Sequence, residues 1–417
     1  MEKVVIGFAG LTHLGVNSLA AAAERGFEVI GFDENSETVD GIASGRIEIN
    51  EDGLMNLLEK NSKRITYSAD PGTLSRCDIV YISIDVPTDD EANSDLKPIE
   101  AAINHVLESI YAETILVILC QVPPGFSRKI QQRHHNTYYQ VETLVFGRAV
   151  ERALFPERYI VGCVNPENVD AIFLQHLEAY DCPILPMRFE SAELCKTAIN
   201  LFLAATVSTA NTLADICERI GADWSEITPS LRLDHRIGQY AYVETGLGLS
   251  GGNIERDLRT VQRLGEMYGA NLSVVDACIA HSKYRKQWVT DRFEEFTQEV
   301  DLQSVGVLGL SYKEGTHSIK NSPSIEFITR NSNYEIKVFD PVVKKLPKSI
   351  AVKFCDDPYD VAIGVDVLLV CTAWPEFKSL NIEKLTARMR NKIIIDPFNL
   401  LKNVGLNTCT HIILGKV

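Results

Sequence analysis

Residues 10–15, Gly-Leu-Thr-His-Leu-Gly, form a glycine-rich loop between a short apolar run, Val4 to Ile6, and an alanine-rich helical pattern, Val16 to Arg25. Glycines at such spacing let a backbone approach a phosphate, which the N–H groups at the start of a helix can bind. Thr12 stands where this motif has its second glycine, so its Cβ should push a pyrophosphate away, although its hydroxyl could donate a hydrogen bond in part compensation. On the loop alone, an ordinary strand-to-helix turn without a nucleotide is the alternative.

Asp33 favours the nucleotide interpretation of this loop. It follows the second apolar run, Glu28 to Phe32, at the spacing of a residue that hydrogen-bonds a ribose 2′-OH. Glu34 follows it in place of an arginine, and because a carboxylate would repel a 2′-phosphate, the pair favours NAD over NADP. The residues that we expect to hold NAD here are Gly10, Thr12, Leu14, Gly15 and Asp33.

Strands and helices must alternate to position such a loop, and the first part of the chain has this pattern. Apolar runs at 78–84, 114–119 and 159–164 are separated by helical stretches. This alternation is typical of a doubly wound parallel sheet. We place the first domain, a Rossmann-like NAD-binding domain, at residues 1–185.

The rest of the chain predicts a helical region and a second α/β region. From Ser191 to about Phe296, long amphipathic helical patterns replace the apolar runs, and a helix of that length usually bridges domains or builds a dimer interface. At Val305 a second strand-loop-helix-strand pattern begins. We therefore expect two Rossmann-like doubly wound parallel-sheet domains joined by a central long helix, with a helical dimerisation domain at 186–299 and a C-terminal α/β domain at 300–417.

Composition limits the possible partners. The 417 residues carry a formal net charge of −15, which would repel nucleic acid and anionic lipid, so an anionic ligand needs a local cluster of basic side chains. The ten cysteines show no metal-ligand spacing, which predicts no metal site and favours reduced thiols in a cytosol. The N-terminus runs straight into an apolar strand and no apolar stretch reaches about 18 residues, so we expect a soluble cytoplasmic protein with neither signal peptide nor membrane span.

Further segments resemble a known family. They are Val122–Gly125 (V-P-P-G), Val141–Gly162, Ala192–Asn200 (A-E-L-C-K-T-A-I-N), Gly309–Pro323 and Thr372–Phe377 (T-A-W-P-E-F). With the first loop, they resemble the UDP-glucose/GDP-mannose dehydrogenase family over essentially the entire chain. The resemblance implies an enzyme of polysaccharide biosynthesis that oxidises the primary alcohol of a UDP-, GDP- or TDP-hexose to a carboxylate. Such an enzyme uses two NAD and an active-site cysteine whose thiolate forms a thioester.

The cysteine of this family pattern is missing. Gly246–Asp257 matches the family's glycine-rich segment, and Asn253 stands at the position of the cysteine. A carboxamide is no useful nucleophile, so the thioester route cannot run. We therefore expect a single two-electron oxidation of an alcohol to a carbonyl, or action at a different carbon.

The resemblance also implies roles for other residues. Glu142 matches a glutamate associated with water activation, while Lys196, Asn200 and Asp257 match the polar set around the reacting carbon, where an ammonium stabilises alkoxide charge. Lys313 matches a nucleotide-sugar lysine, and Arg236 matches an arginine that often reaches the sugar site from a neighbouring subunit of a homodimer. The expected catalytic residues are Glu142, Lys196, Asn200, Asn253 and Asp257, and the expected substrate-binding residues are Arg236, Gly248, Gly251 and Lys313.

Several positions depart from the family pattern. Beside the cofactor we expect Pro87, Gln121 and Lys320, of which Gln121 replaces a threonine and Lys320 an arginine. Arg256 replaces a lysine, Phe398 an arginine, and Thr38 a lysine at the adenosine end. These changes leave substrate identity and cofactor affinity open.

Simpler interpretations exist for the same residues. Exposed glutamates are common, so Glu142 alone would be taken for a solvated loop residue. Lys196 and Asn200, one helical turn apart, would be a polar stripe on an amphipathic helix. For the whole chain, the alternative is a non-catalytic nucleotide-sugar-binding or assembly protein on the same fold, consistent with the changes at Thr12, Gln121 and Asn253.

Overall fold

An eight-stranded sheet with the strand order β3-β2-β1-β4-β5-β6-β7-β8 organises the first half of the computed structural model. The structure describes residues 3–46, 49, 51–86, 95–145, 147–249, 253–298, 300–401 and 409–416. The strands are β1 (Val5–Ala9), β2 (Glu28–Phe32), β3 (Ile65–Ser68), β4 (Ile79–Ile82), β5 (Ile115–Ile118), β6 (Thr137–Gln140), β7 (Tyr159–Cys163) and β8 (Ile184–Arg188). All neighbouring pairs are parallel except β6 and β7, which are antiparallel.

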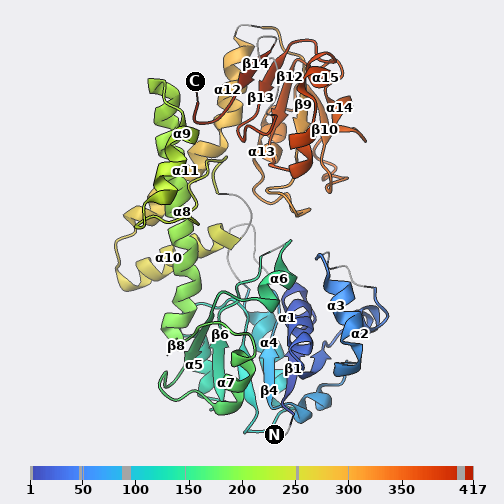
Figure 1. Cartoon of the computed structure of the whole chain (residues 1–417), viewed down its shortest axis with the longest axis vertical. Helices are drawn as coiled ribbons and strands as arrows, with labels where there is room; N and C mark the ends of the chain where they lie inside the picture. The colour runs from blue at the N-terminus through green and yellow to red at the C-terminus, as the bar shows by residue number, and fades with distance from the viewer. Residues whose placement is uncertain are drawn as a thin grey trace. The chain divides into compact units, whose positions relative to one another are not determined.

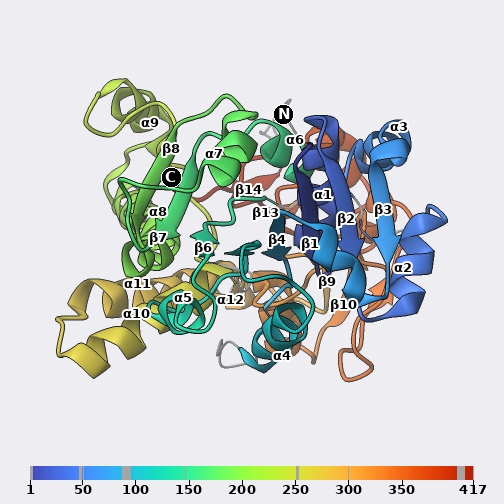
Figure 2. The ribbon, with the colours of Figure 1, turned by 90° about the horizontal axis from the view of Figure 1, so that it is seen from below.

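Helices cover both faces of this sheet. They are α1 (His13–Glu24), α2 (Ser36–Ala43), α3 (Leu54–Lys60), α4 (Lys97–Leu107), α5 (Phe126–Gln131), α6 (Ala149–Leu154) and α7 (Ala171–Glu178). Successive residues of a strand point to opposite faces, so Ile79 and Tyr81 pack into the core that contains α1 and α7, while Val80 and Ile82 pack into the core that contains α4 and α5. Figure 2 shows the two sets of helices on opposite sides of the strands. This is the doubly wound arrangement expected from the sequence.

The chain forms two compact units, Met1–Ile199 and Asn200–Val417 (Figure 1). The boundary falls within the longest helix, α8 (Phe189–Ile220), whose 32 residues confirm the expected long central helix. The further helices before the second sheet are α9 (Trp224–Leu233), α10 (Asn253–Tyr268), α11 (Ser273–Lys286) and α12 (Trp288–Thr297). The finer division into domains at 1–185, 186–299 and 300–417 stays a prediction.

A six-stranded parallel sheet with the order β11-β10-β9-β12-β13-β14 forms the remainder of the second unit. Its strands are β9 (Ser304–Leu308), β10 (Glu335–Phe339), β11 (Lys353–Phe354), β12 (Val367–Val370), β13 (Ile393–Ile395) and β14 (Thr410–Ile412), and its helices are α13 (Pro323–Arg330), α14 (Pro358–Val361) and α15 (Ile382–Thr386). One face packs against α12 and the second half of α8, through residues such as Phe293 and Ala214. The α/β fold with two parallel sheets is therefore confirmed.

The described residues contain neither a membrane-spanning helix nor a cluster of metal ligands. None of the helices in this part of the chain is long and apolar enough to cross a membrane. In the same ranges, His, Cys, Asp and Glu side chains form no group of three or more that could hold a metal ion.

Candidate cofactor and catalytic sites

The glycine-rich loop joins β1 to α1 in a turn that only glycine permits. Gly10 has φ +106°, and a Cβ there would lie 2.6 Å from the Ile84 side chain. At Gly15 a Cβ would lie 1.9 Å from the carbonyl oxygen of Gly10. The helix therefore begins directly above the strand end, with the unpaired N–H groups of its first turn at the carboxyl edge of the sheet. Leu14 is buried in the core, so only its backbone faces this edge.

Asp33 fixes the loop from the neighbouring strand. Its Oδ2 accepts a hydrogen bond from the Leu11 N–H at 2.9 Å, and its Oδ1 accepts one from the Asn35 N–H at 3.0 Å. A carboxylate has four lone-pair sites, so two remain for ribose hydroxyls. The position at the end of β2 is the one that the sequence predicts for a ribose ligand.

The strand order places several predicted residues in one row. Strands β2, β1, β4, β5 and β6 are consecutive neighbours in the sheet and run parallel. Their carboxyl ends therefore meet at one edge, and the order reverses between β1 and β4, which is where nucleotides bind in such sheets. The residues after the five strands are, in the same order, Asp33, Gly10, Asp85, Gln121 and Glu142.

An open hollow lies beside the start of α1. It has about 860 Å³ of solvent space, within the range of about 300–1,000 Å³ typical of small-ligand sites. Leu11, Thr12 and His13 line it from the loop, Asp85 from the end of β4, and Asn35 and Thr38 from α2 and its N-cap. Since Gly10 and Gly15 make a backbone cradle and Asp33 offers free acceptor sites, these residues fit an NAD molecule.

The Thr12 hydroxyl has a partner within the protein. It donates a hydrogen bond to the carbonyl oxygen of Ser83 at 2.9 Å. The parallel pairing of β1 with β4 brings this carbonyl next to the loop. The expected hydrogen bond from the hydroxyl to a phosphate would replace this bond and stays a prediction.

A second polar network, which sequence reasoning missed, supports the loop. His13 Nε2 lies 2.8 Å from Oε1 of Glu51, and the same oxygen accepts a hydrogen bond from the Gly147 N–H at 2.9 Å. The other oxygen, Oε2, accepts one from the Ala149 N–H at 3.0 Å. Burial opposes ionisation of Glu51, but the hydrogen bonds from His13 and these backbone groups hold the pKa of its carboxyl below the ordinary value. Glu51 thus links α1 to the start of α6. Nothing in the sequence near Glu51 marks this role.

Glu142 and Lys196, two predicted catalytic residues, are in contact. Lys196 Nζ donates to the carbonyl oxygen of Glu142 at 2.9 Å and to its Oε2 at 3.3 Å. Three residues before Lys196 on α8, the buried Glu193 accepts hydrogen bonds from the N–H groups of Gly125 at 2.6 Å and Ser127 at 2.7 Å. Glu193 therefore attaches the loop after β5 to the helix that carries Lys196.

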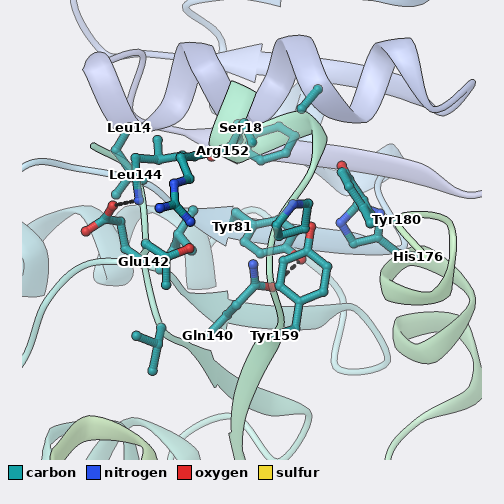
Figure 3. Close-up of a pocket in the computed structure, with 17 residues that line it drawn as sticks. Leu14, Ser18, Tyr81, Gln140, Glu142, Leu144, Arg152, Tyr159, His176 and Tyr180 are labelled. Atoms are coloured by element: carbon teal, nitrogen blue, oxygen red, sulfur yellow. Dashed lines mark hydrogen bonds between the residues drawn. The ribbon is translucent and has the colours of Figure 1, made fainter. Parts of the chain in front are cut away.

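Glu142 also lines a small cavity of the first unit, which is shown in Figure 3. Glu142 lies at one end of this cavity, and His176 and Tyr180 lie at the other. Between them, the Tyr81 hydroxyl donates to Oε1 of Gln140 at 3.0 Å. Burial lowers the pKa of His176 to about 3, so this imidazole is neutral at physiological pH. The space for water is only about 40 Å³, enough for a few water molecules and too small for a cofactor.

Asn200 and Asp257 form a second pair, in the second unit. The Asn200 side-chain amide donates to Oδ2 of Asp257, and both residues are buried. Arg256 Nε lies 3.7 Å from Oδ1 of Asp257. A buried carboxylate with an amide and a guanidinium is held in one orientation, which is what a residue that positions a reacting group requires.

The glycine-rich segment before α10 is anchored on two helices. The Leu249 N–H donates to the Ser282 hydroxyl at 2.9 Å and the Gly246 N–H to the Asn211 side chain at 2.9 Å. Gly248 has φ +80°, and a Cβ there would lie 2.6 Å from the Ser282 carbonyl oxygen, so glycine is required. Asn253 is the first residue of α10. The side chain of Asn253, together with Gly251 and Pro87, lies outside the described residues.

The second sheet repeats the arrangement of the first at its carboxyl edge. Gly309, with φ +94°, follows β9, and Asp340 follows β10. Unlike Asp33, Asp340 is fully buried and accepts from Leu310 N–H at 2.7 Å, Ser311 N–H at 3.1 Å and the Trp374 indole at 3.1 Å. Its other oxygen, Oδ1, accepts from the N–H groups of Val342 at 2.9 Å and Val343 at 2.8 Å. Asp340 therefore holds the loop and has no capacity left for a ligand. Sequence reasoning missed it, although its position at a strand end was a signal.

The predicted cations of the second unit lie in different settings. Lys313 is half-buried in the loop that Asp340 holds, and its Nζ lies 5.9 Å from the centre of the Tyr312 ring. Lys320 is half-buried in the same loop. Arg236 is exposed and makes two hydrogen bonds to Asp234, at 3.0 and 2.6 Å. The structure thus brings the two lysines into one loop and pairs Arg236 with a neighbouring carboxylate.

Burial makes most of the cysteines poor nucleophiles. It raises the pKa of Cys77, Cys120 and Cys371 to about 12 and raises the pKa of Cys163, Cys182, Cys217, Cys355 and Cys409 above the ordinary value. The thiolate is the reactive form, so these thiols are less reactive at neutral pH than an exposed cysteine. Cys278, the cysteine nearest to Asn253 in sequence, is buried on α11.

Comparison with known proteins gives matches over most of the chain. Residues 4–177 match the NAD binding domain of the UDP-glucose/GDP-mannose dehydrogenase family, residues 190–283 its central domain, and residues 306–403 its UDP binding domain.

Individual proteins show the same similarity. A UDP-glucose 6-dehydrogenase of Rickettsia conorii is 30% identical over 348 residues, which cover 79% of each chain. The UDP-glucose 6-dehydrogenase TuaD of Bacillus subtilis is 27% identical over 96% of this chain and 90% of its own. Among solved structures, a UDP-glucose dehydrogenase from Pyrobaculum islandicum superimposes with a TM-score of 0.84 at 27% identity, over 95% of this chain and 94% of its own.

Proposed function

Because this chain belongs to the UDP-glucose/GDP-mannose dehydrogenase family, we propose that it oxidises one alcohol of a nucleotide sugar in a single two-electron step and releases the carbonyl product. The family's NAD-binding and UDP-binding domains are both present. The observation that carries the single step is Asn253 at the position where the family pattern has its nucleophilic cysteine. The raised pKa values of the buried cysteines support it, because no other activated thiol is evident among them.

The residues of the first unit suffice for this step. When bound, NAD supplies the hydride acceptor. The carbon of the substrate alcohol loses a hydride and its hydroxyl loses a proton, so that an alcohol becomes a carbonyl. The Lys196 ammonium donates a hydrogen bond to the oxygen and stabilises its developing negative charge, while the Glu142 carboxylate beside it takes the proton.

The test is turnover with a panel of UDP-, GDP- and TDP-hexoses in the presence of NAD and hydroxylamine, which traps a released carbonyl as an oxime. We expect NADH and an oxime of the nucleotide sugar with at least one member of the panel. A uronate product without any trapped carbonyl would contradict the single-step proposal. The matched control is the protein without sugar nucleotide, which should form no NADH.

A non-catalytic nucleotide-sugar-binding protein is the second candidate, and one observation favours it. The Thr12 hydroxyl donates a hydrogen bond to the Ser83 carbonyl oxygen, and the Asp85 carboxylate lines the hollow beside the start of α1. The cofactor site is therefore less favourable for an anion than the family pattern implies. Calorimetric titration separates the two candidates. Binding of a sugar nucleotide with no binding of NAD under any condition would favour the second.

A homodimer in the cytoplasm completes the proposal. Large apolar side chains of the second unit are exposed, with Phe202 at 77%, Leu233 at 81% and Tyr240 at 89%. Exposed apolar residues in such numbers are typical of a protein interface. The cysteines are all free, which fits a reducing compartment. Light scattering should give twice the chain mass, and a monomer would contradict the dimer.

A further inference from the structure

Asp85 is the residue of the candidate cofactor site that neither the glycine motif nor the catalytic set explains. It lies three residues after β4, at the point where the order of the strands reverses between β1 and β4. Its carboxylate lies near the Thr12 side chain and the backbone N–H of His13, the first residue of α1, and all three residues line the same hollow. The carboxylate therefore lies beside the unpaired N–H groups that a helix start offers to an anion.

The surroundings of the Asp85 carboxylate raise its pKa. Asp85 lines the hollow, and its side chain is exposed to it. Partial loss of hydration raises the pKa of the Asp85 carboxyl, and the negative charge of Glu142 acts in the same direction. His13, which pairs with Glu51, has the opposite influence. The other ionisable residues that line the hollow are Glu37, Asp40 and Arg46.

We propose, on the basis of the proposed function, that Asp85 sets the affinity for NAD by competing with the cofactor's pyrophosphate for the start of α1. A pyrophosphate placed there by the Gly10–Gly15 cradle meets a like charge beside the same N–H groups. Binding then requires the carboxylate to take up a proton or to move away from the start of α1. Either event weakens NAD binding at neutral and alkaline pH, and the first couples binding to proton uptake.

The direction of the pH dependence follows from the charges. The phosphates of bound NAD disfavour the charged form of Asp85 further, so the pKa of its carboxyl is higher in the complex than in the free protein. Between these two pKa values the complex holds more protons than the free protein. NAD therefore binds more tightly as the pH falls through this interval.

The test is isothermal titration calorimetry of NAD with the full-length protein and its Asp85→Asn variant at pH 6 and pH 8. The variant keeps the size of the side chain and removes the charge. We expect it to bind NAD about tenfold more tightly than wild type at pH 8, with a smaller difference at pH 6. Glu59→Gln, which removes the same charge from an exposed residue of α3 that is not among the residues lining the hollow, is the matched control and should change the affinity by less than about twofold.

A second measurement needs no variant. Titration of the wild-type protein at pH 7 in two buffers of different ionisation enthalpy reports the protons taken up on binding, and we expect uptake. Equal NAD affinities for wild type and Asp85→Asn, with no proton uptake, would overturn the inference and leave the proposed function intact. Failure of both proteins to bind NAD at either pH would overturn both.

Discussion

Replacement of Lys196 by methionine tests the catalytic assignment in the first unit. The Lys196 Nζ donates to the Glu142 carbonyl oxygen at 2.9 Å and to Oε2 at 3.3 Å. An ammonium has three N–H donors, so one is left for the substrate oxygen. Removal of one preorganised donor to a developing oxyanion costs about 2.7–4 kcal/mol, or about 100- to 1,000-fold in kcat. Lys196→Met should therefore lower kcat by this factor.

The assay is the steady-state rate of NADH formation with a sugar nucleotide that the wild type oxidises. The NAD affinity of Lys196→Met should stay within about twofold of wild type, because the lost hydrogen bond stabilises the transition state and does not contribute to binding of the cofactor. Lys196→Arg keeps the charge but presents a planar fork, so we expect partial recovery of kcat. Lys129→Met, which removes an exposed lysine from α5, is the control and should leave the rate unchanged.

The reasoning would be refuted by a Lys196→Met protein that is folded, binds NAD and keeps kcat within about threefold of wild type. A rise in KM at constant kcat would also count against it, because it would show that Lys196 contributes only ground-state binding.

Three further changes have expected outcomes. Glu51→Ala removes the acceptor of two backbone N–H groups and of His13. It should lower the free energy of unfolding, measured in urea at pH 7, by about 3 kcal/mol. Because the pKa of Glu51 is lowered, this difference between wild type and variant should shrink as the pH falls through the ordinary carboxyl range and below it. A difference that does not change with pH would contradict the ionic role. Gly15→Ala places a Cβ 1.9 Å from the Gly10 carbonyl and should abolish NAD binding in calorimetry, whereas retained affinity would contradict the cradle. Asn253→Cys supplies the missing thiol and should yield uronate detectable by mass spectrometry; a product unchanged from wild type would show that the nucleophile is not the only missing part.

The sequence predicted the fold well where the signal was local. The apolar runs, the loop between Gly10 and Gly15, and Asp33 form a pattern within the first 33 residues, and the structure has β1, α1 and β2 there. The run of helices after Ser191 was equally clear, because amphipathic periodicity extends over many turns. Short strands with polar residues were missed, such as β6 with the sequence Thr-Tyr-Tyr-Gln, since four residues carry too little periodicity.

The candidate site was predictable only in part, because much of it depends on contacts between distant segments. Asn200 and Asp257 are 57 positions apart, and only the family resemblance put them in one set. Asp85 reaches the start of α1 because β4 pairs with β1, and Glu51 reaches His13 across 38 positions. Neither residue belongs to a motif. The bond from Thr12 to Ser83 depends on the same strand pairing, so the sequence did not show that this hydroxyl has a partner within the protein.

The number of NADH molecules formed per molecule of sugar nucleotide tests the central claim most directly. The reaction is run to completion with excess NAD and limiting sugar nucleotide, with hydroxylamine present to remove the carbonyl product. A single oxidation predicts one NADH per molecule of sugar nucleotide, and all of the oxidised sugar nucleotide should be recovered as its oxime. Two NADH per sugar with a uronate product would show that the chain completes the four-electron reaction without a cysteine at position 253, and would contradict the account.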